Sequence, residues 1–167
     1  ALTNGPTWIA GKYGKALQFD GVDDVVNIGN PSSLSGLSQI TISAWIYPTG
    51  YPDGAASVVN KGDTGGREYG CFAYSDGHIH WSTNGTTNWA LDSPAGSFPS
   101  NTWTHMVVLY NGSAKKIFAN GVEVASQANT GGITATATNI GIGQGGSSGY
   151  RFAGTIDEVR IYNTALT

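Results

Sequence analysis

Two stretches decide the fold of this chain: GKALQFDGVDDVVNI at residues 14–28 and FAGTIDEVRIYNTAL at residues 152–166. Each alternates apolar and polar residues as a β-strand does, and each carries carboxylates within the alternation. Side chains at positions i and i+2 of a strand share a face, so Asp24 lies with Val26, and Asp157 lies with Val159. Both carboxylates are therefore predicted to face the buried side of a sheet.

A buried carboxylate requires hydrogen-bond donors, a cation or a bound metal ion. The chain has only eight lysine and arginine residues in 167, so few cationic side chains are available. Calcium takes about six to eight oxygen ligands from carboxylates, backbone carbonyls and water. The two stretches therefore predict a structural calcium ion.

Seven segments, in order, carry a resemblance to a known family: FDGVDDVV at 19–26, ITISAWIYP at 40–48, VVNKGD at 58–63, NTWTHMVVLYNG at 101–112, FANGVEV at 118–124, IGIGQG at 140–145 and GTIDEVRIYNTALT at 154–167. They resemble the laminin-G-like domains of the concanavalin A-like lectin and glucanase superfamily. The resemblance implies an all-β fold, an antiparallel β-sandwich of the jelly-roll type. It implies no particular ligand, because lectins, carbohydrate-binding modules, adhesion domains, glycosidases and polysaccharide lyases all use this fold.

In the fold that the resemblance implies, the first and last strands lie close together. The turn at residues 20–24 can then meet Asp157, and we expect calcium ligands from the carboxylates of Asp20, Asp24 and Asp157 and from the carbonyl of Gly21. The alternative is that these aspartates cap turns through nearby backbone amides, as Asp does readily.

Composition agrees with one β-sandwich domain at residues 1–167. Glycine is frequent, at 25 residues, and only 11% of the residues are charged, as in a sandwich with many tight turns. The net charge of −3 argues against nucleic acid or an anionic membrane as the partner. No apolar run approaches the roughly 20 residues of a membrane-spanning helix.

The cysteine count says little about function, and a secreted module is what the family resemblance implies, because many of the β-rich relatives are secreted. Cys71 is the single cysteine, so the chain forms no internal disulfide, and its strand setting indicates a packed thiol. No signal peptide is recognisable at the start of the chain. We expect a mature fragment, or one domain of a longer secreted protein whose other domains are its partners.

Asn-Gly and Asp-Gly pairs set the register of the central strands. A loop at residues 75–77 places Phe72 opposite His80, and a two-residue turn at Asn84-Gly85 places His80 opposite Trp89. The resulting three-stranded meander has two faces. The first face collects Cys71, Ala73, Ile79, Trp81 and Ala90, and the second collects Phe72, Tyr74, His78, His80, Trp89 and Leu91.

The second face combines aromatic rings with hydrogen-bonding groups, as sugar recognition requires. A pyranose ring stacks its C–H face on Trp or Tyr while its hydroxyls take directional partners. We therefore expect a sugar site at Tyr74, His78, His80 and Trp89. The alternative is that this face is the core, because alternation does not say which face is inside.

Two further groups of aromatic residues receive separate predictions. Tyr150 and Arg151 lie in a Gly-rich loop, where an exposed aromatic ring beside an arginine can hold a sugar or a protein. Tyr51 lies in a similar loop, and surface decoration is the alternative for all three. Trp45 and Trp103 lie in strongly apolar strands and are expected in the core.

Together these features predict a non-catalytic carbohydrate-binding module that binds a polysaccharide or glycan, with an adhesion or protein-interaction domain as the alternative. A glycosidase or lyase is a remote alternative. Retaining glycosidases place two carboxyl groups about 5–5.5 Å apart, and Glu68, Glu123 and Glu158 lack carboxylates at the spacing that the glucanases use. His78-Ile79-His80 likewise lacks the partners that an alginate lyase would need.

Overall fold

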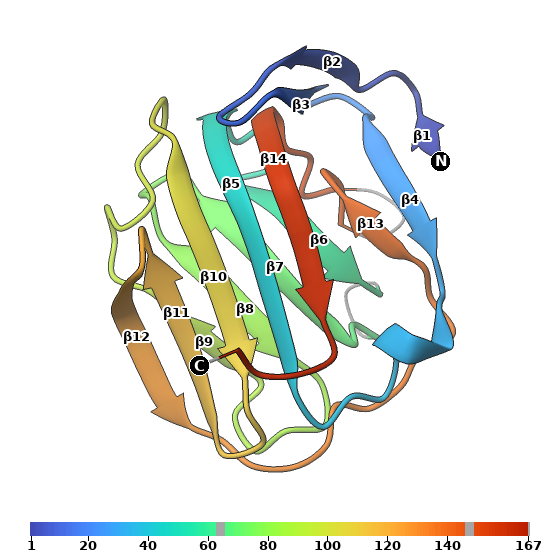
Figure 1. Ribbon diagram of the computed structural model, residues 1–167, viewed down its shortest axis with the longest axis vertical. Helices are drawn as coiled ribbons and strands as arrows, with labels where there is room; N and C mark the ends of the chain where they lie inside the picture. The colour runs from blue at the N-terminus through green and yellow to red at the C-terminus, as the bar shows by residue number, and fades with distance from the viewer. Residues whose placement is uncertain (63–65, 146–148, 167) are drawn as a thin grey trace.

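A computed structural model describes residues 1–62, 66–145 and 149–166. Asp63 and Thr167, at the ends of two of the family segments, lie outside the described residues. The described chain forms two antiparallel sheets packed face to face, which confirms the predicted all-β sandwich (Figure 1). No helix among the described residues is long and apolar enough to cross a membrane.

The first sheet contains, in spatial order, β1 (Leu2–Thr3), β4 (Val25–Gly29), β13 (Ile140–Ile142), β6 (Ala55–Lys61), β7 (Tyr69–Tyr74), β8 (Ile79–Thr83) and β9 (Ala90–Asp92). The second sheet contains β12 (Val122–Ala128), β11 (Ala114–Ala119), β10 (Thr104–Tyr110), β5 (Ile40–Gly50), β14 (Ala153–Tyr162), β3 (Lys15–Asp20) and β2 (Thr7–Ala10). A 3-10 helix, η1 (Ser32–Leu34), precedes β5.

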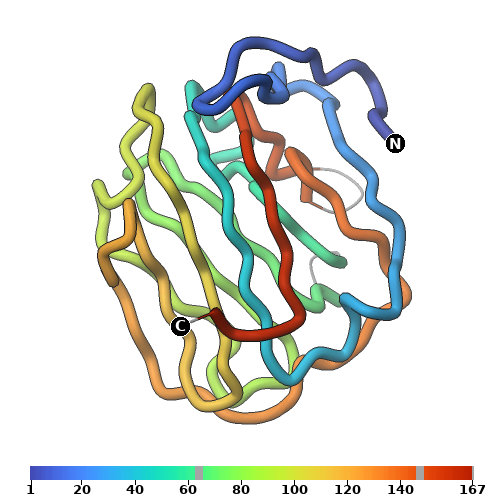
Figure 2. The backbone as a smooth tube through the Cα atoms, in the orientation of Figure 1, coloured from blue at the N-terminus to red at the C-terminus, as the bar shows by residue number. Residues whose placement is uncertain are grey.

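Strands from the two ends of the sequence lie side by side, as the family resemblance implied. β3 pairs with β14 so that Asp20 lies opposite Ala153 and Leu17 opposite Ile156, and Figure 2 shows the two segments together. Gly21 follows β3 with a φ of +78°, and a Cβ there would stand 2.8 Å from the Cβ of Ala153. Glycine is therefore required where this turn packs on β14.

Alternating residues of the two sheets fill the core between them. On β7 and β8, the side chains of Cys71, Ala73, Ile79 and Trp81 are fully buried, as the first predicted face required. The indole of Trp81 donates a hydrogen bond to the Leu109 carbonyl across the sandwich (3.2 Å). Burial raises the pKa of the Cys71 thiol to about 12, so it is a packed thiol.

The core prediction for Trp45 and Trp103 is wrong. On β5 the apolar residues Ile40, Ile42, Ala44 and Ile46 are fully buried, so Trp45 faces outward by the same alternation and is only partly buried. Its ring lies beside that of His105 (5.2 Å), and Trp103 lies beside Tyr47 (5.5 Å). An apolar run does not distinguish its inward from its outward members.

One of the two predicted hairpin registers is confirmed. Phe72 lies opposite His80, as expected, but His80 lies opposite Asp92 and not Trp89. The connection between β8 and β9 is a six-residue loop, closed by a hydrogen bond from the Thr83 amide to the Trp89 carbonyl (2.8 Å).

The longer loop reverses the predicted faces of β9. Leu91 lies opposite Trp81 and packs against the core, whereas Ala90 lies opposite Ser82 on the other side. Contacts to distant segments explain the longer loop, since the amides of Asn84 and Thr87 donate to the carbonyls of Glu68 and Thr130.

Candidate functional site

The outer face of the first sheet, away from the core, carries most of the predicted ligand-binding residues. The ring of Tyr74 stacks on that of His78, with centroids 4.3 Å apart, and His80 contacts Trp89 edge to face at 5.4 Å. Phe72 joins His80 (6.3 Å) to Tyr150 (5.2 Å). We call these six residues the aromatic cluster: Phe72, Tyr74, His78, His80, Trp89 and Tyr150.

The two histidines of the aromatic cluster are oriented by carboxylates. His78 Nδ1 lies 2.6 Å from Asp76 Oδ1, and His80 Nδ1 lies 2.6 Å from Asp92 Oδ1. A neutral ring that donates from Nδ1 keeps Nε2 as an acceptor. Burial lowers the pKa of His80, and the positive charge of Arg67 acts in the same direction, although Asp92 opposes both. His80 is therefore a neutral hydrogen-bonding group near pH 7.

Arg67 belongs to this face and was missed by the sequence analysis. Its guanidinium lies over the ring of Phe72 at 4.3 Å and within 6.0 Å of the rings of Trp89 and Tyr150. It also donates to the Ser82 hydroxyl (3.3 Å). Arg67 precedes β7 in an irregular segment, so strand periodicity gave no signal for it.

Buried polar side chains hydrogen-bond to the backbone of the loop that carries Trp89. Lys115 Nζ donates to the carbonyls of Asn88 (2.8 Å) and Trp89 (2.6 Å), and burial lowers the pKa of Lys115 to about 7. Asn129 accepts from the Asn88 amide and donates to the Asn88 carbonyl. The backbone is thereby held while the Trp89 side chain remains 55% exposed.

Arg151, predicted beside Tyr150 as a ligand-binding residue, takes a different position. Its guanidinium forms a bidentate pair with Asp53 (2.9 and 2.6 Å) and donates to the Val22 carbonyl (3.2 Å). These bonds join the loop after β5 to the turn after β3. Tyr51 packs partly buried against the core, and the Ser100 hydroxyl donates to its oxygen (3.4 Å).

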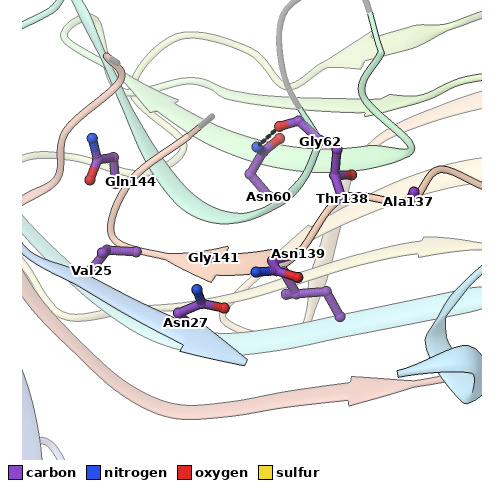
Figure 3. Close-up of a pocket in the computed structure, with 10 residues that line it drawn as sticks. Val25, Asn27, Asn60, Gly62, Ala137, Thr138, Asn139, Gly141 and Gln144 are labelled. Carbon is purple, nitrogen blue, oxygen red and sulfur yellow. Dashed lines mark hydrogen bonds between the residues drawn. The ribbon is translucent and has the colours of Figure 1, made fainter. Parts of the chain in front are cut away.

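A hollow of about 420 Å³ lies beside the aromatic cluster on the same face. The register explains it: Gly141 of β13 lies between Asn27 of β4 and Asn60 of β6 and has no side chain to fill the space. We call it the amide pocket, since Asn27, Asn60, Asn139 and Gln144 line it together with Thr138 (Figure 3). A glycine inside a strand signals close approach of another group, and Gly141 in IGIGQG carried that signal.

The structure brings two of the predicted calcium-binding carboxylates together, those of Asp20 and Asp24, and places the third, Asp157, elsewhere. Carboxylate oxygens of Asp20, Asp23 and Asp24 lie within 4.8 Å of one another, and Asp24 is 5% exposed. Its Oδ2 accepts from the Asp20 amide (2.9 Å). Burial raises the pKa of Asp24, and the negative charges of Asp20 and Asp23 raise it further.

Asp157 lies elsewhere. It is buried, but not on the face that parity predicted: it lies opposite the outward-facing Trp45, while Ile156 lies opposite the buried Ile46. An irregularity between Asp157 and Arg160 shifts the alternation, so that Val159 and Ile161 pack against the core and Asp157 does not share their face.

The Asp157 carboxylate accepts from the amides of Tyr13 (2.9 Å) and Glu158 (2.8 Å). Since Asp20 lies opposite Ala153, Asp157 is four residues further along β14, about 13 Å away. Backbone amides therefore satisfy the Asp157 carboxylate, and the structure does not bring it to the turn at residues 20–24.

Among solved structures, the chain is similar to domain 4 of AbnA, a GH43 extracellular arabinanase from Geobacillus stearothermophilus, in complex with arabinotriose. The TM-score is 0.74 and the identity 21%, covering 99% of this chain and 78% of that one. The CBM40 of the Ruminococcus gnavus IT-sialidase, bound to α2,3-sialyllactose, gives a TM-score of 0.71 at 19% identity and covers 91% of both chains. At these identities the likeness shows a shared fold.

Sequence comparison gives a relative and a family. The chain is 26% identical over 140 residues to Adhesion G-protein coupled receptor V1 of Danio rerio; the match covers 78% of this chain but only 2% of the receptor. The family model described as the concanavalin A-like lectin/glucanases superfamily matches residues 19–167 and confirms the resemblance carried by the seven segments. The chain therefore belongs to the concanavalin A-like lectin/glucanases superfamily.

Proposed function

We propose that this chain is a non-catalytic carbohydrate-binding module of a secreted, multidomain protein. The observation that carries the proposal is the aromatic cluster, where Trp89 is exposed beside His80, and where carboxylates hold both His80 and His78. An exposed aromatic ring offers a stacking surface for the C–H face of a sugar, and fixed polar groups beside it give hydroxyls directional partners. The arabinotriose and sialyllactose complexes of proteins with this fold support glycan as the class of ligand.

The positions of the carboxylates support a binding role over a catalytic one. The three glutamates are each paired with a cation: Glu68 with Lys61, Glu123 with Lys116 and Glu158 with Arg160. The two aspartates nearest the aromatic cluster are paired with His78 and His80. A glycosidase requires one carboxyl group to protonate the leaving group and another to attack or activate water.

The proposed function is tested on a panel of soluble polysaccharides: arabinan, galactan, xylan, mannan, β-glucan and alginate. We expect retarded migration of the protein in an affinity gel containing at least one of them, without release of reducing ends or unsaturated products. The proposal would be refuted if the protein bound no polysaccharide of the panel and also bound nothing on a sialylated glycan array. Turnover that disappears on replacing one Asp or Glu would establish an enzyme instead.

An adhesion or protein-interaction domain is the second candidate function. It is favoured by the relative in Danio rerio, which is an adhesion receptor. A protein-interaction surface would use the outward aromatic residues of the second sheet, Tyr13 and Trp45 among them, whose rings lie 5.7 Å apart. Loss of glycan binding in the Trp89 variant described below, but not in a Trp45→Ala variant, would favour the carbohydrate-binding function.

A structural calcium ion is the second part of the proposal. The donor set suits a hard cation, because three carboxylates converge and one of them is buried. Asp20, Asp23 and Asp24 would hold the ion with the Gly21 carbonyl, and the ion would relieve the repulsion among these carboxylates. It would also fix the turn that Arg151 joins to the loop after β5.

Calcium is expected to raise the melting temperature by several degrees. A ligand that binds only the folded state adds RT ln(1 + [L]/Kd), about 2.7 kcal/mol at a hundredfold excess over Kd. Differential scanning fluorimetry with EDTA and with calcium checks this. The response should be lost in Asp24→Asn and kept in Asp157→Asn. An identical melt in EDTA and calcium would exclude the ion, and loss of the response in Asp157→Asn alone would restore Asp157 as a ligand.

Glycan binding is expected to weaken as the solution is acidified. A sugar hydroxyl that donates to His80 Nε2 requires the neutral ring, and His80 has a pKa below its ordinary value of 6.5. Affinity should therefore be constant near pH 7 and fall by up to about tenfold per pH unit once the pH drops below that pKa. Titration calorimetry with the best polysaccharide of the panel, between pH 8 and pH 4.5, measures the profile. A His80→Gln variant should show a flatter profile, and an unchanged profile in that variant would exclude His80 as the acceptor.

A further inference from the structure

We propose that the amide pocket is a second sugar subsite, so that the outer face of the first sheet binds several units of an uncharged polysaccharide chain. This inference rests on the proposed function and deepens it. It concerns the part of the face that contains β4, β13 and β6, which the sequence analysis did not assign to a ligand.

The lining of the amide pocket has the chemistry of sugar hydroxyls. Its polar side chains are four carboxamides and one hydroxyl, and no described residue of the lining is charged. A carboxamide both donates and accepts hydrogen bonds, as a sugar hydroxyl does. A carboxylate, sulfate or phosphate on the ligand would instead require arginine or lysine. Lys61, the nearest lysine in the sequence, is buried and paired with Glu68 at 2.8 Å. The pocket therefore suits an uncharged, hydroxyl-rich unit.

Glycine makes the floor of the amide pocket accessible. A Cβ on Gly141 would stand 3.0 Å from the Gln144 carbonyl and would project between Asn27 and Asn60. The backbone φ of Gly141 is not in the left-handed region, so this position does not need glycine for its conformation. The close approach of the Gln144 carbonyl favours glycine here, and the missing side chain also leaves the space between Asn27 and Asn60 open to a ligand.

Two buried polar atoms lie where the amide pocket meets the aromatic cluster. Asn60 Oδ1 and Ser57 Oγ have no hydrogen-bond partner among the described residues, although Asn60 is 3% exposed and Ser57 is fully buried. Asn60 Oδ1 and the Phe72 ring both border the space above Gly70. Ser57 and the other side of the Phe72 ring border the space above Gly145. A buried polar atom without a partner is destabilising unless water or a ligand satisfies it.

The same phenyl ring makes the two subsites continuous. Phe72 borders Asn60 on the side of the amide pocket and contacts His80 and Tyr150 on the side of the aromatic cluster. From β13 through β6 and β7 to β8 there are three strand spacings, or about 14 Å. One sugar ring is too short to contact both Gly141 and His80. A ligand that uses both subsites therefore crosses the strands as an oligosaccharide.

The test uses an oligosaccharide ladder of one to six units prepared from the neutral polysaccharide that binds best in the panel. Titration calorimetry on the full chain should show affinity rising with length up to several units. The double variant Asn139→Ala/Gln144→Ala should bind the longest oligosaccharide roughly tenfold more weakly, since two neutral hydrogen bonds are removed, and should bind the shortest as the unmodified chain does. Neither side chain has a hydrogen bond within the described part of the chain, so folding should be unaffected. The matched control is Gln18→Ala/Asn163→Ala, two exposed amides outside this face.

The outcomes separate the inference from the proposed function. Equal affinity for all lengths, or an equal loss at every length in the double variant, would overturn the second subsite and leave carbohydrate binding intact. Binding of sialyllactose or alginate only, with no neutral polysaccharide bound, would likewise overturn it. Absence of binding to any glycan would overturn both.

Discussion

Replacing Trp89 with alanine is expected to weaken binding to the best polysaccharide of the panel by roughly 30-fold or more. A stacking aromatic residue at the centre of a small site contributes about 2 kcal/mol or more. Trp89 contacts His80 and lies near Arg67, while its side chain is 55% exposed. Its removal therefore takes away ligand contact without leaving a cavity in the core, and the melting temperature should stay nearly unchanged. Affinity electrophoresis and calorimetry measure the binding, and thermal unfolding monitors the fold.

The matched control is Trp8→Ala. Trp8 is 60% exposed on β2, which belongs to the other sheet. This variant should keep the affinity of the unmodified chain. Equal affinity in the Trp89 variant and the unmodified chain would remove the aromatic cluster as the sugar site. If the Trp89 variant instead unfolds, its side chain is structural, and the ligand must be sought elsewhere.

The largest expected loss of stability comes from Glu68→Ala, which should lower the free energy of unfolding by about 3–5 kcal/mol. Glu68 and Lys61 form an ion pair of 2.8 Å with both side chains fully buried. The carboxylate also accepts from the amides of Gly36 (2.7 Å) and Thr136 (2.8 Å). Removing it leaves an uncompensated buried ammonium group and frees the segment that leads to Thr138 and Asn139 of the amide pocket. Denaturant unfolding measures the change.

A control variant and the pH dependence of stability test whether the buried pair of Glu68 and Lys61 stabilises the fold. Glu123→Ala, which breaks the exposed pair with Lys116, should change the free energy of unfolding by less than about 1 kcal/mol. Burial alone would raise the pKa of Glu68, but Lys61 and the two amides outweigh it and hold the pKa below its ordinary value. The contribution of the pair is therefore present above the pKa of unfolded glutamate and is lost as the pH falls through the folded pKa. Equal losses in the two alanine variants would contradict the buried pair.

The sequence by itself determined the fold class and which residues of β7 and β8 share a face. Alternation and turn residues in seven ordered segments specified an antiparallel sandwich, because strand period and tight-turn chemistry are local properties. The Asp-Gly turn also fixed Phe72 opposite His80, since a short loop leaves one register. Parity also predicted the burial of Asp24, but it placed Asp157 on the wrong face, because the irregularity between Asp157 and Arg160 shifts the alternation of β14.

Tertiary structure alone decided what satisfies each buried carboxylate and where the site lies. Asp157 is bound by backbone amides that strand parity does not reveal, whereas Asp24 faces two other aspartates. The loop before β9 is lengthened by bonds to Glu68, Thr130, Lys115 and Asn129, all distant in sequence. The amide pocket is built from three strands that are distant in sequence, with Asn27 on β4, Gly141 on β13 and Asn60 on β6. Such contacts depend on the order of strands in the sheet, which local periodicity does not encode.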